Sequence, residues 1–390
     1  MSDPFQRSLD LHIQQRGKLA IASKVPLATQ DDLAAAYSPG VARPCEVIAA
    51  DPTRARDLTV KGNSVAIVSD GSAVLGLGNI GPLAALPVME GKALLFKEYA
   101  GIDAWPIVLD TQDIDEIVET VRRIAPTFGG INLEDISAPR CFEIEARLQD
   151  LPIPVFHDDQ HGTAIVLLAG LMNAAKVTGR ELTGLKVVIN GAGAAGTAIA
   201  KLLRCVGYSA DVCEPVADVV VCDSRGTIGP GRSDLSPAKK ELLGYTNAKG
   251  KDGELRDVLA GADVFIGVSI GNLLNEADVR SMAPDPILFP MANPTPEILP
   301  EVALAGGASI VGTGRSDFPN QVNNVLAFPG IFRGALDAGA DRIDATMMLH
   351  AARALAACVP NPSAERILPS PLEKDTARAV AAAVAEAADL

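Results

Sequence analysis

The feature that most constrains this chain is a glycine-rich turn between an apolar strand and a helix. The run L-K-V-V-I-N ends at Asn190, the turn reads G-A-G-A-A-G, and helical spacing follows from 197 to 206. The first glycine permits a tight turn, the second lets a pyrophosphate approach the backbone, and the third allows close helix packing. We therefore predict a Rossmann-like, doubly wound sheet whose turn binds a dinucleotide through Gly191, Ala192, Gly193, Ala194, Ala195 and Gly196.

The next strand of that half, V-V-V-C, leads to a second part of the predicted cofactor site at Asp223. Asp223 lies further on than the usual ~20 residues, and the extra length falls in 211–218, which we expect to be a loop. A carboxylate there accepts the ribose hydroxyls of NAD, whereas Ser224 and Arg225 can meet the 2′-phosphate of NADP. The choice between NAD and NADP stays open.

Strands and helices also alternate before the glycine-rich turn, which predicts a mainly parallel sheet there too. Strand-like runs are found at 65–69, 105–109, 128–133 and 153–156, and later at 264–268, 287–291 and 309–311. We expect a bend at Gly91, a helix from Lys92, and a long apolar helix over 163–177. A chain of 390 residues is too long for one ordinary core. We predict an N-terminal α/β domain at 1–160 and a Rossmann-like domain with C-terminal helices at 161–390.

Two adjacent pairs of acids, Glu134-Asp135 and Asp158-Asp159, each follow a short apolar run. In parallel sheets, ligands bind beyond the carboxyl ends of the strands. Converging carboxylates at such an edge favour Mg²⁺ or Mn²⁺. One such pair is usually a solvated turn, and Asp158-Asp159 can also cap the helix that begins near Gly162. Two pairs so close in sequence favour a metal site.

Three further residues have both an ordinary interpretation and a chemical one. Lys92 is by local sequence a surface lysine; buried beside a metal, it would have a lowered pKa and act as a base. Tyr37, in A-Y-S-P-G-V, is a turn aromatic or a proton donor. Asn293, in A-N-P-T-P, is a turn former or a residue that faces the cofactor or substrate.

Composition excludes several classes of partner. The net charge of -14 opposes binding to nucleic acid or anionic membranes, and aromatic residues make up only 4% of the chain. No apolar run reaches membrane-spanning length, and the start lacks a signal-peptide pattern. The six cysteines show no regular framework, so we expect mostly buried thiols in a reducing cytoplasm.

Taken together, these motifs resemble those of malic enzymes of the compact bacterial kind. The matching segments include Y-S-P-G-V, V-L-G-L-G-N-I-G-P, P-V-M-E-G-K, N-L-E-D-I, F-H-D-D-Q-H-G-T, G-A-G-A-A-G, N-P-T-P and F-P-N-Q-V-N-N. The resemblance runs from about Leu19 to at least Leu336. It implies oxidative decarboxylation of L-malate to pyruvate and CO₂ with reduction of NAD or NADP, dependent on Mg²⁺ or Mn²⁺. It also implies a homodimer.

The resemblance also implies individual roles. Tyr37 would be the general acid, Lys92 the general base, and Asp158 a supporting carboxylate near Lys92. The metal ligands would be Glu134, Asp135 and Asp159, while Asn293 and Asn324 would contact malate or the nicotinamide. Larger members of the family place a substrate-binding arginine just before L-G-L-G, where this chain has Ser72-Ala73-Val74.

Two alternatives stay open. A malolactic enzyme would retain its NAD and release lactate. A non-catalytic dinucleotide sensor would need no metal, and its binding of NAD(P) would be unaffected by Lys92→Ala.

Overall fold

The computed structural model describes residues 3–210 and 212–388. Its first half is built on a parallel sheet in the order β2-β1-β3-β4. The strands are β1 (Ser64–Ser69), β2 (Asp103–Val108), β3 (Gly130–Leu133) and β4 (Val155–His157). The helices of this half are α5 (Pro82–Ala100), α6 (Ile114–Ile124) and α7 (Arg140–Leu148). Every residue of β1 is buried, so this strand forms the centre of the N-terminal core.

The second half is built on a six-stranded sheet in the order β10-β9-β8-β5-β6-β7. All neighbouring strands are parallel except β6 and β7. The strands are β5 (Lys186–Asn190), β6 (Asp218–Asp223), β7 (Gly226–Thr227), β8 (Val264–Gly267), β9 (Ile287–Pro290) and β10 (Ile310–Val311). The chain runs outward on both sides of β5. This is the switch point at which doubly wound sheets bind their ligands, and the predicted fold class is confirmed.

Helices complete this half and join it to the first. Those around the second sheet are α8 (Asp158–Thr178), α9 (Ala194–Leu203), α10 (Pro237–Leu243), α11 (Leu255–Leu259), α12 (Glu276–Arg280) and α13 (Pro300–Ala305). The predicted boundary at 160/161 falls in the first turn of α8, which leads from β4 to β5, and the division into two domains stays a prediction. In the described chain, no helix combines the length and apolar character that a membrane crossing requires.

The C-terminal helices pack against the N-terminal half as well as their own. They are α14 (Phe328–Ala338), α15 (Ala345–Ala357) and α16 (Asp375–Ala388). Phe328 and Phe332 of α14 meet Phe96 of α5 edge to face, with ring centroids 4.7 and 5.4 Å apart. Phe332 also contacts Phe156 of β4 at 5.8 Å. One apolar core therefore runs across both halves. It fixes the two sheets relative to each other.

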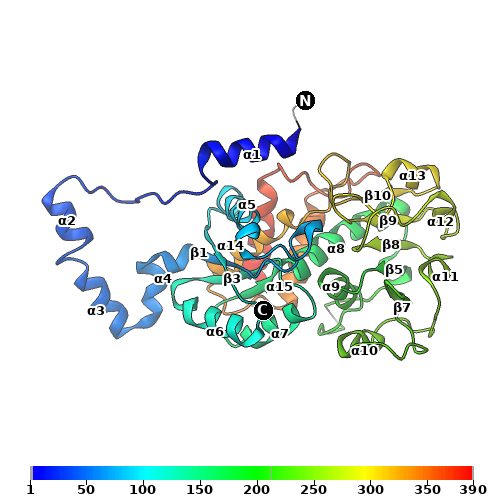
Figure 1. Cartoon of the computed structure of the whole chain (residues 1–390), viewed down its shortest axis with the longest axis horizontal. Coiled ribbons are helices and arrows are strands. Elements are labelled where there is room, and N and C mark those ends of the chain that lie inside the picture. Colours follow the sequence, from blue (N-terminus) through cyan, green and yellow to red (C-terminus); the bar gives the residue numbers. More distant parts are fainter. Residues whose placement is uncertain (1–2, 211, 389–390) are drawn as a thin grey trace.

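Four helices precede the first sheet. They are α1 (Pro4–Gln15), α2 (Gln30–Ala36), α3 (Ala42–Ala50) and α4 (Ala55–Leu58). Figure 1 shows α2 and α3 projecting away from both sheets, at the blue end of the colour scale. In α1, α2 and α3 the structure has no buried residue.

Two predicted helix starts are wrong. The helix α5 begins at Pro82, after Gly81, and continues through Gly91 to Ala100. Proline is favoured at the first position of a helix, and an isolated glycine inside one costs only about 1 kcal/mol relative to alanine. The helix α8 begins at Asp158 rather than near Thr163, so both aspartates lie in its first turn.

One pair of cysteines departs from the expectation of mostly buried thiols. Cys205 and Cys213 form a disulfide that closes the loop between α9 and β6. The other four cysteines are free, and Cys141 and Cys222 are buried as expected. The predicted loop over 211–218 is confirmed for 212–217, with Asp211 outside the described residues and Asp218 already the first residue of β6.

Candidate active site

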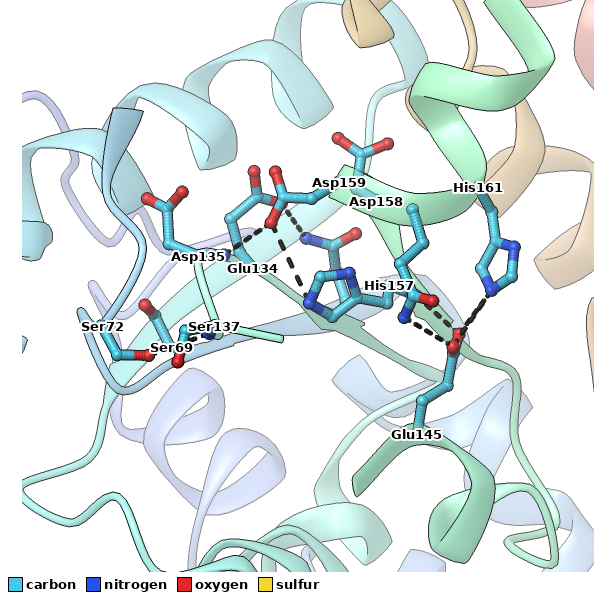
Figure 2. Close-up of polar contacts among 12 residues, drawn as sticks. Ser69, Ser72, Glu134, Asp135, Ser137, Glu145, His157, Asp158, Asp159 and His161 are labelled. Atoms are coloured by element: carbon cyan, nitrogen blue, oxygen red, sulfur yellow. Dashed lines mark hydrogen bonds and ion pairs between the residues drawn. The ribbon is translucent and has the colours of Figure 1, made fainter. Parts of the chain in front are cut away.

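The acidic pairs converge because β3 and β4 are parallel neighbours. Leu133 pairs with His157 in register, so Glu134 and Asp158, the next residues, leave the sheet at the same edge. Suitable ligand atoms of Glu134, Asp135 and Asp159 lie within 4.8 Å of one another. Figure 2 shows these carboxylates grouped at the ends of the two strands. The sequence pattern therefore predicted which side chains come together.

The local backbone supports this grouping. The Asp135 amide donates a hydrogen bond to Asp159 Oδ2 at 2.8 Å, which ties the β3 loop to the first turn of α8. Asn132 Nδ2 donates to Glu134 Oε2 at 2.8 Å. Asp135 has a φ of 54°, a left-handed conformation that aspartate tolerates better than most residues. These contacts hold the carboxylates in place before any ligand binds.

The cluster has the properties of a divalent-cation site. Burial raises the pKa of Glu134, Asp135 and Asp159, and the repulsion between the neighbouring carboxylates raises it further. Asp135 Oδ2 is buried without a hydrogen-bond partner in the described chain. A cation such as Mg²⁺ or Mn²⁺ takes oxygen ligands and would relieve this repulsion. The residues fit a hard divalent metal.

Lys92 extends from α5 into the same cluster and is buried, not a surface lysine. Its Nζ lies 2.5 Å from Asp158 Oδ2 and 2.8 Å from Glu134 Oε1, and 4.3 Å from the centre of the Phe328 ring. Burial alone would lower the pKa of Lys92, but Asp158 and Glu134 outweigh it, so the pKa is raised. Two carboxylates contact the ammonium and cause this rise, and the lowering that we predict for Lys92 beside a bound metal stays a prediction.

Asp158 does not cap α8, because the residue at the N-cap is His157. Its carboxylate binds Lys92 through Oδ2, whereas Oδ1 is buried and has no partner in the described chain. Gly162 makes room for it, since a Cβ there would lie 1.9 Å from Asp158 Oδ1 and 3.3 Å from Asn324 Cβ. The structure therefore places Asn324 near Asp158, and its contact with a substrate stays a prediction.

The glycine-rich turn has the conformation that its sequence requires. Gly191 has a φ of 127°, and a Cβ on Gly196 would lie only 1.8 Å from the Gly191 carbonyl oxygen. Gly193 is the N-cap of α9, whose first turn contains Ala194, Ala195 and Gly196. The turn opens into a cavity of about 900 Å³ whose lining includes Gly191, Ala192, Gly193, Asp223, Arg225 and Lys239. Apart from Asn293, the predicted cofactor residues thus line one cavity or begin the helix behind it.

Asp223 is already engaged by cations that the sequence did not predict. It accepts two hydrogen bonds from Arg232, at 2.8 and 3.1 Å, and one from Lys239 at 2.6 Å. Despite its partial burial, these bonds lower its pKa to about 2. Arg225 turns its side chain to Asp234 at 2.8 Å. The ribose end of the cavity is therefore a network of carboxylates and cations, not a single free aspartate.

Asn293 lies where the two halves touch. A Cβ on Gly76 would lie 2.4 Å from the Asn293 carbonyl oxygen, so the short helix η3 (Leu75–Leu77) packs directly on this backbone. The segment that leads into η3 is in turn joined to the carboxylate cluster, because the Ala73 amide donates to the Asp135 carbonyl at 2.9 Å. The Asn293 backbone thus contacts the segment next to the carboxylate cluster, but Asn293 does not line the cavity that the glycine-rich turn, Asp223 and Arg225 share.

An arginine contacts the segment just before L-G-L-G. Arg140, the first residue of α7, donates to Asp70 Oδ2 at 2.7 Å and to Ser72 Oγ at 2.8 Å. Figure 2 shows Ser72 beside the carboxylate cluster. Sequence reasoning missed Arg140, because it lies in a different element from the L-G-L-G motif.

A second missed group supports the site from behind. Glu145 of α7 accepts hydrogen bonds from the His157 amide at 3.0 Å and from Gln160 Nε2 at 3.0 Å, and it pairs with His161 Nε2 at 2.9 Å. These contacts hold β4 and the start of α8. The only available signal was the F-H-D-D-Q-H motif, which holds three of the four residues.

The candidate general acid Tyr37 is not brought to this site within one chain. It is the residue that ends α2, it is 70% exposed, and α2 projects away from the body in Figure 1.

A doubly wound dinucleotide-binding sheet joined to a second sheet that carries a buried lysine and a carboxylate cluster defines a nicotinamide-dependent oxidoreductase architecture. Comparison with known proteins then shows the family. Residues 16–149 match the malic enzyme N-terminal domain, and residues 160–389 match the malic enzyme NAD binding domain. The chain belongs to the malic enzyme family, whose named members are oxidoreductases.

Similar proteins extend this match over nearly the whole chain. A bifunctional malic/malolactic enzyme of Bacillus subtilis is 58% identical over 387 residues, covering 98% of this chain and 92% of that protein. An NAD-dependent malic enzyme of Geobacillus stearothermophilus is 54% identical, covering 98% and 78%. The crystal structure of an NAD-dependent malic enzyme from Thermotoga maritima superposes with a TM-score of 0.92 at 45% identity, covering 99% of both chains.

Proposed function

We propose that this protein oxidatively decarboxylates L-malate to pyruvate and CO₂, reduces NAD⁺ or NADP⁺, and requires a divalent metal. The observation that carries the proposal is the contact of Lys92 with Asp158 and Glu134 inside a cluster of buried carboxylates. A dinucleotide sensor has no need for such a cluster. The family of the chain supports the same reaction.

Each side chain has a task that its position suits. A cation held by Glu134, Asp135 and Asp159 would stabilise negative charge on the C2 oxygen of malate and later on the enolate. Its charge would also oppose the carboxylates around Lys92 and so lower the pKa of Lys92. Neutral Lys92 takes the C2 hydroxyl proton as hydride passes from C2 to the nicotinamide ring. Asp158 orients Lys92, and Asn324 and Asn293 bind the substrate or the nicotinamide.

The second stage needs a proton donor. Loss of CO₂ from the ketone leaves an enolate, and protonation of its C3 gives pyruvate. We assign this protonation to Tyr37, whose phenol is a suitable general acid. The site lies between two halves, so substrate can be enclosed by a movement of one half against the other.

The test is a pair of initial-rate measurements with NAD⁺ and NADP⁺ at saturating malate and Mn²⁺. We expect dinucleotide reduction and one pyruvate for each reduced cofactor, and loss of both after chelation of the metal. A folded protein that reduces neither cofactor would contradict the proposal. The same assay measures cofactor preference, which the network around Asp223 leaves open.

A malolactic activity is the second candidate, because the Bacillus subtilis relative is named a bifunctional malic/malolactic enzyme. It would appear in the same assay as lactate formed without net NADH. We further propose a cytoplasmic location and a homodimer.

A further inference from the structure

Glu297 is a buried carboxyl group to which the proposed reaction gives no task. It is fully buried, and within residues 3–210 and 212–388 no lysine, arginine or histidine forms an ion pair with it. Burial raises the pKa of Glu297, whereas hydrogen bonds from backbone amides oppose that rise. An acid that is buried without a counter-charge lowers stability unless its oxygens are hydrogen-bonded, so the partners of Glu297 indicate why it is there.

The two carboxyl oxygens of Glu297 each bind a different loop. Oε1 accepts a hydrogen bond from the Ser269 amide at 3.0 Å, and Oε2 accepts one from the Ala292 amide at 3.0 Å. Ser269 belongs to residues 268–274, which follow β8, and Ala292 belongs to residues 291–297, which follow β9. Because β8 and β9 are parallel neighbours, both loops leave the sheet at the same edge (Figure 1).

The surroundings of Glu297 hold its carboxyl group in this position. A Cβ on Gly267, the last residue of β8, would lie 2.2 Å from Glu297 Cδ, so only glycine leaves room for the side chain. The backbone adds two further bonds, since the amides of Leu273 and Leu274 donate to the Glu297 carbonyl at 2.7 and 2.9 Å. Glu297 therefore fixes the two loops to each other through its side chain and its main chain.

The two loops serve different parts of the candidate active site. Ser269 and Leu273 of the first loop line the cavity of the glycine-rich turn. The backbone of Asn293, in the second loop, contacts η3, and the segment that leads into η3 is hydrogen-bonded to the carboxylate cluster. Ala292, the partner of Glu297, directly precedes Asn293. Glu297 thus joins a wall of the dinucleotide cavity to a loop that contacts the substrate half.

We propose that Glu297 is a positioning residue for hydride transfer, which sets the distance between the nicotinamide and C2 of malate by fixing loop 268–274 to loop 291–297. The inference rests on the proposed function. Glu297 does not itself line the dinucleotide cavity, so it acts through the loops. Such an action can be large, because a displacement of about 1 Å caused by a residue away from the reacting atoms can lower a rate by about 10²-fold.

The variant Glu297→Gln tests the proposal. Glutamine has a similar size but only one acceptor oxygen, so its amide NH₂ faces one of the two backbone amides and releases one loop. With malate, Mn²⁺ and the cofactor that the wild type reduces, we expect kcat to fall by about 10- to 100-fold. The Kd of the reduced cofactor, measured by fluorescence titration, should stay at the wild-type value.

An isotope effect separates positioning from stability. With malate deuterated at C2, the isotope effect on kcat should rise in Glu297→Gln, because hydride transfer becomes the slow step. The matched control is Glu301→Gln, the same chemical change at an exposed position in α13, which should keep the wild-type kcat and isotope effect.

A second variant decides the matter if Glu297→Gln does not fold. Glu297→Asp keeps both acceptor oxygens and withdraws them by one methylene, so it should show a smaller fall in kcat and again a raised isotope effect. Circular dichroism and thermal unfolding check that each variant is folded.

Two results would overturn the inference while the proposed function stands. One is a folded variant with the kcat and the isotope effect of the wild type. The other is a variant with a lower Tm, weaker cofactor binding and an unchanged isotope effect, which would show that Glu297 only supports the fold. Failure of the proposed function is distinguishable, because the wild type itself would then reduce neither cofactor, and the inference would fall with it.

Discussion

Lys92 Nζ donates a hydrogen bond to Asp158 Oδ2 at 2.5 Å, and both side chains are buried. This contact orients the amine that we assign as the base. Lys92→Ala should lower kcat by about 10²- to 10⁴-fold, the usual contribution of general acid–base catalysis. Asp158→Asn should lower it less, by about 10- to 100-fold, because Glu134 still binds the amine.

The measurement is the initial rate with malate and Mn²⁺, with circular dichroism as a check on folding. Lys97→Ala is the matched control, since Lys97 lies on the same helix but is exposed and pairs with Asp103. Equal losses in the Lys92 and Lys97 variants would argue against a specific role for Lys92.

Metal binding should stabilise the folded protein through Asp135. At a free Mn²⁺ concentration 100 times its Kd, binding adds about 2.7 kcal/mol to the free energy of unfolding. Asp135→Asn removes one of three clustered carboxylates, so the rise in Tm on adding Mn²⁺ should largely disappear. Thermal scans with Mn²⁺ or EDTA measure this, and Asp110→Asn, an exposed acid after β2, should respond like the wild type. An unchanged response in Asp135→Asn would place the metal elsewhere.

Cofactor preference should depend on Asp223. Its carboxylate neutralises Arg232 and Lys239, so Asp223→Asn leaves two cations near the ribose end of the cavity without that counter-charge. We expect kcat/KM for NADP⁺ to rise relative to NAD⁺ by about tenfold, equivalent to about 1.4 kcal/mol. Asp218→Asn, at the opposite end of β6, is the control. A ratio that moves towards NAD⁺ would mean that the cations serve only to hold the loop.

The carboxylate cluster was predictable because acids that directly follow neighbouring parallel strands lie at the same edge of the sheet. The register of Leu133 with His157 brings Glu134 and Asp158 together, and alternation of apolar runs with helices reveals such strands. The glycine-rich turn was predictable for a similar reason, since its conformation depends on neighbours in sequence. Both signals are local.

The unpredicted features depend on contacts between distant segments. Nothing in the sequence around Asp223 indicates that Lys239, sixteen residues later, returns to bind it. The position of Tyr37 was not predictable for the same reason, because the motif around it indicates a turn but not that α2 and α3 project from the body. Gly91 led to the opposite error: its local tendency to break a helix is overridden because α5 buries Met89 before it and Ala93 and Phe96 after it.

The disulfide between Cys205 and Cys213 should contribute to stability. A cross-link over so short a loop lowers the entropy of the unfolded chain, which adds about 2 kcal/mol to the free energy of unfolding. Cys205→Ser should therefore lower the free energy of unfolding in oxidising buffer, and the difference from wild type should vanish in dithiothreitol. Thiol titration of the unfolded, unreduced protein should find the four free cysteines only. Six free thiols, or a difference that persists after reduction, would contradict this.

The pairing of Glu145 with His161 predicts a pH-dependent stability. Despite burial, His161 lowers the pKa of Glu145, and despite burial, Glu145 raises the pKa of His161. The histidine contribution is complete below its ordinary pKa of 6.5 and is lost as pH rises through the raised value. The glutamate contribution is complete above its ordinary pKa of 4.5 and is lost as pH falls through the lowered value. Both contributions are therefore complete between these two ordinary values.

Glu145→Gln should consequently destabilise the protein most within that window, by about 2–3 kcal/mol, because a charged acceptor of buried hydrogen bonds is removed. Above it the difference from wild type should shrink as His161 loses its proton, although the bonds from His157 and Gln160 keep part of it. Urea unfolding from pH 5 to pH 9 measures this, with Glu143→Gln as the exposed control on the same helix. A difference that is constant over that range would mean that Glu145 acts only as a neutral hydrogen-bond acceptor. A Glu145→Gln protein that is destabilised yet binds Mn²⁺ with unchanged affinity would show that the pair holds β4 and α8 without tuning the carboxylate cluster.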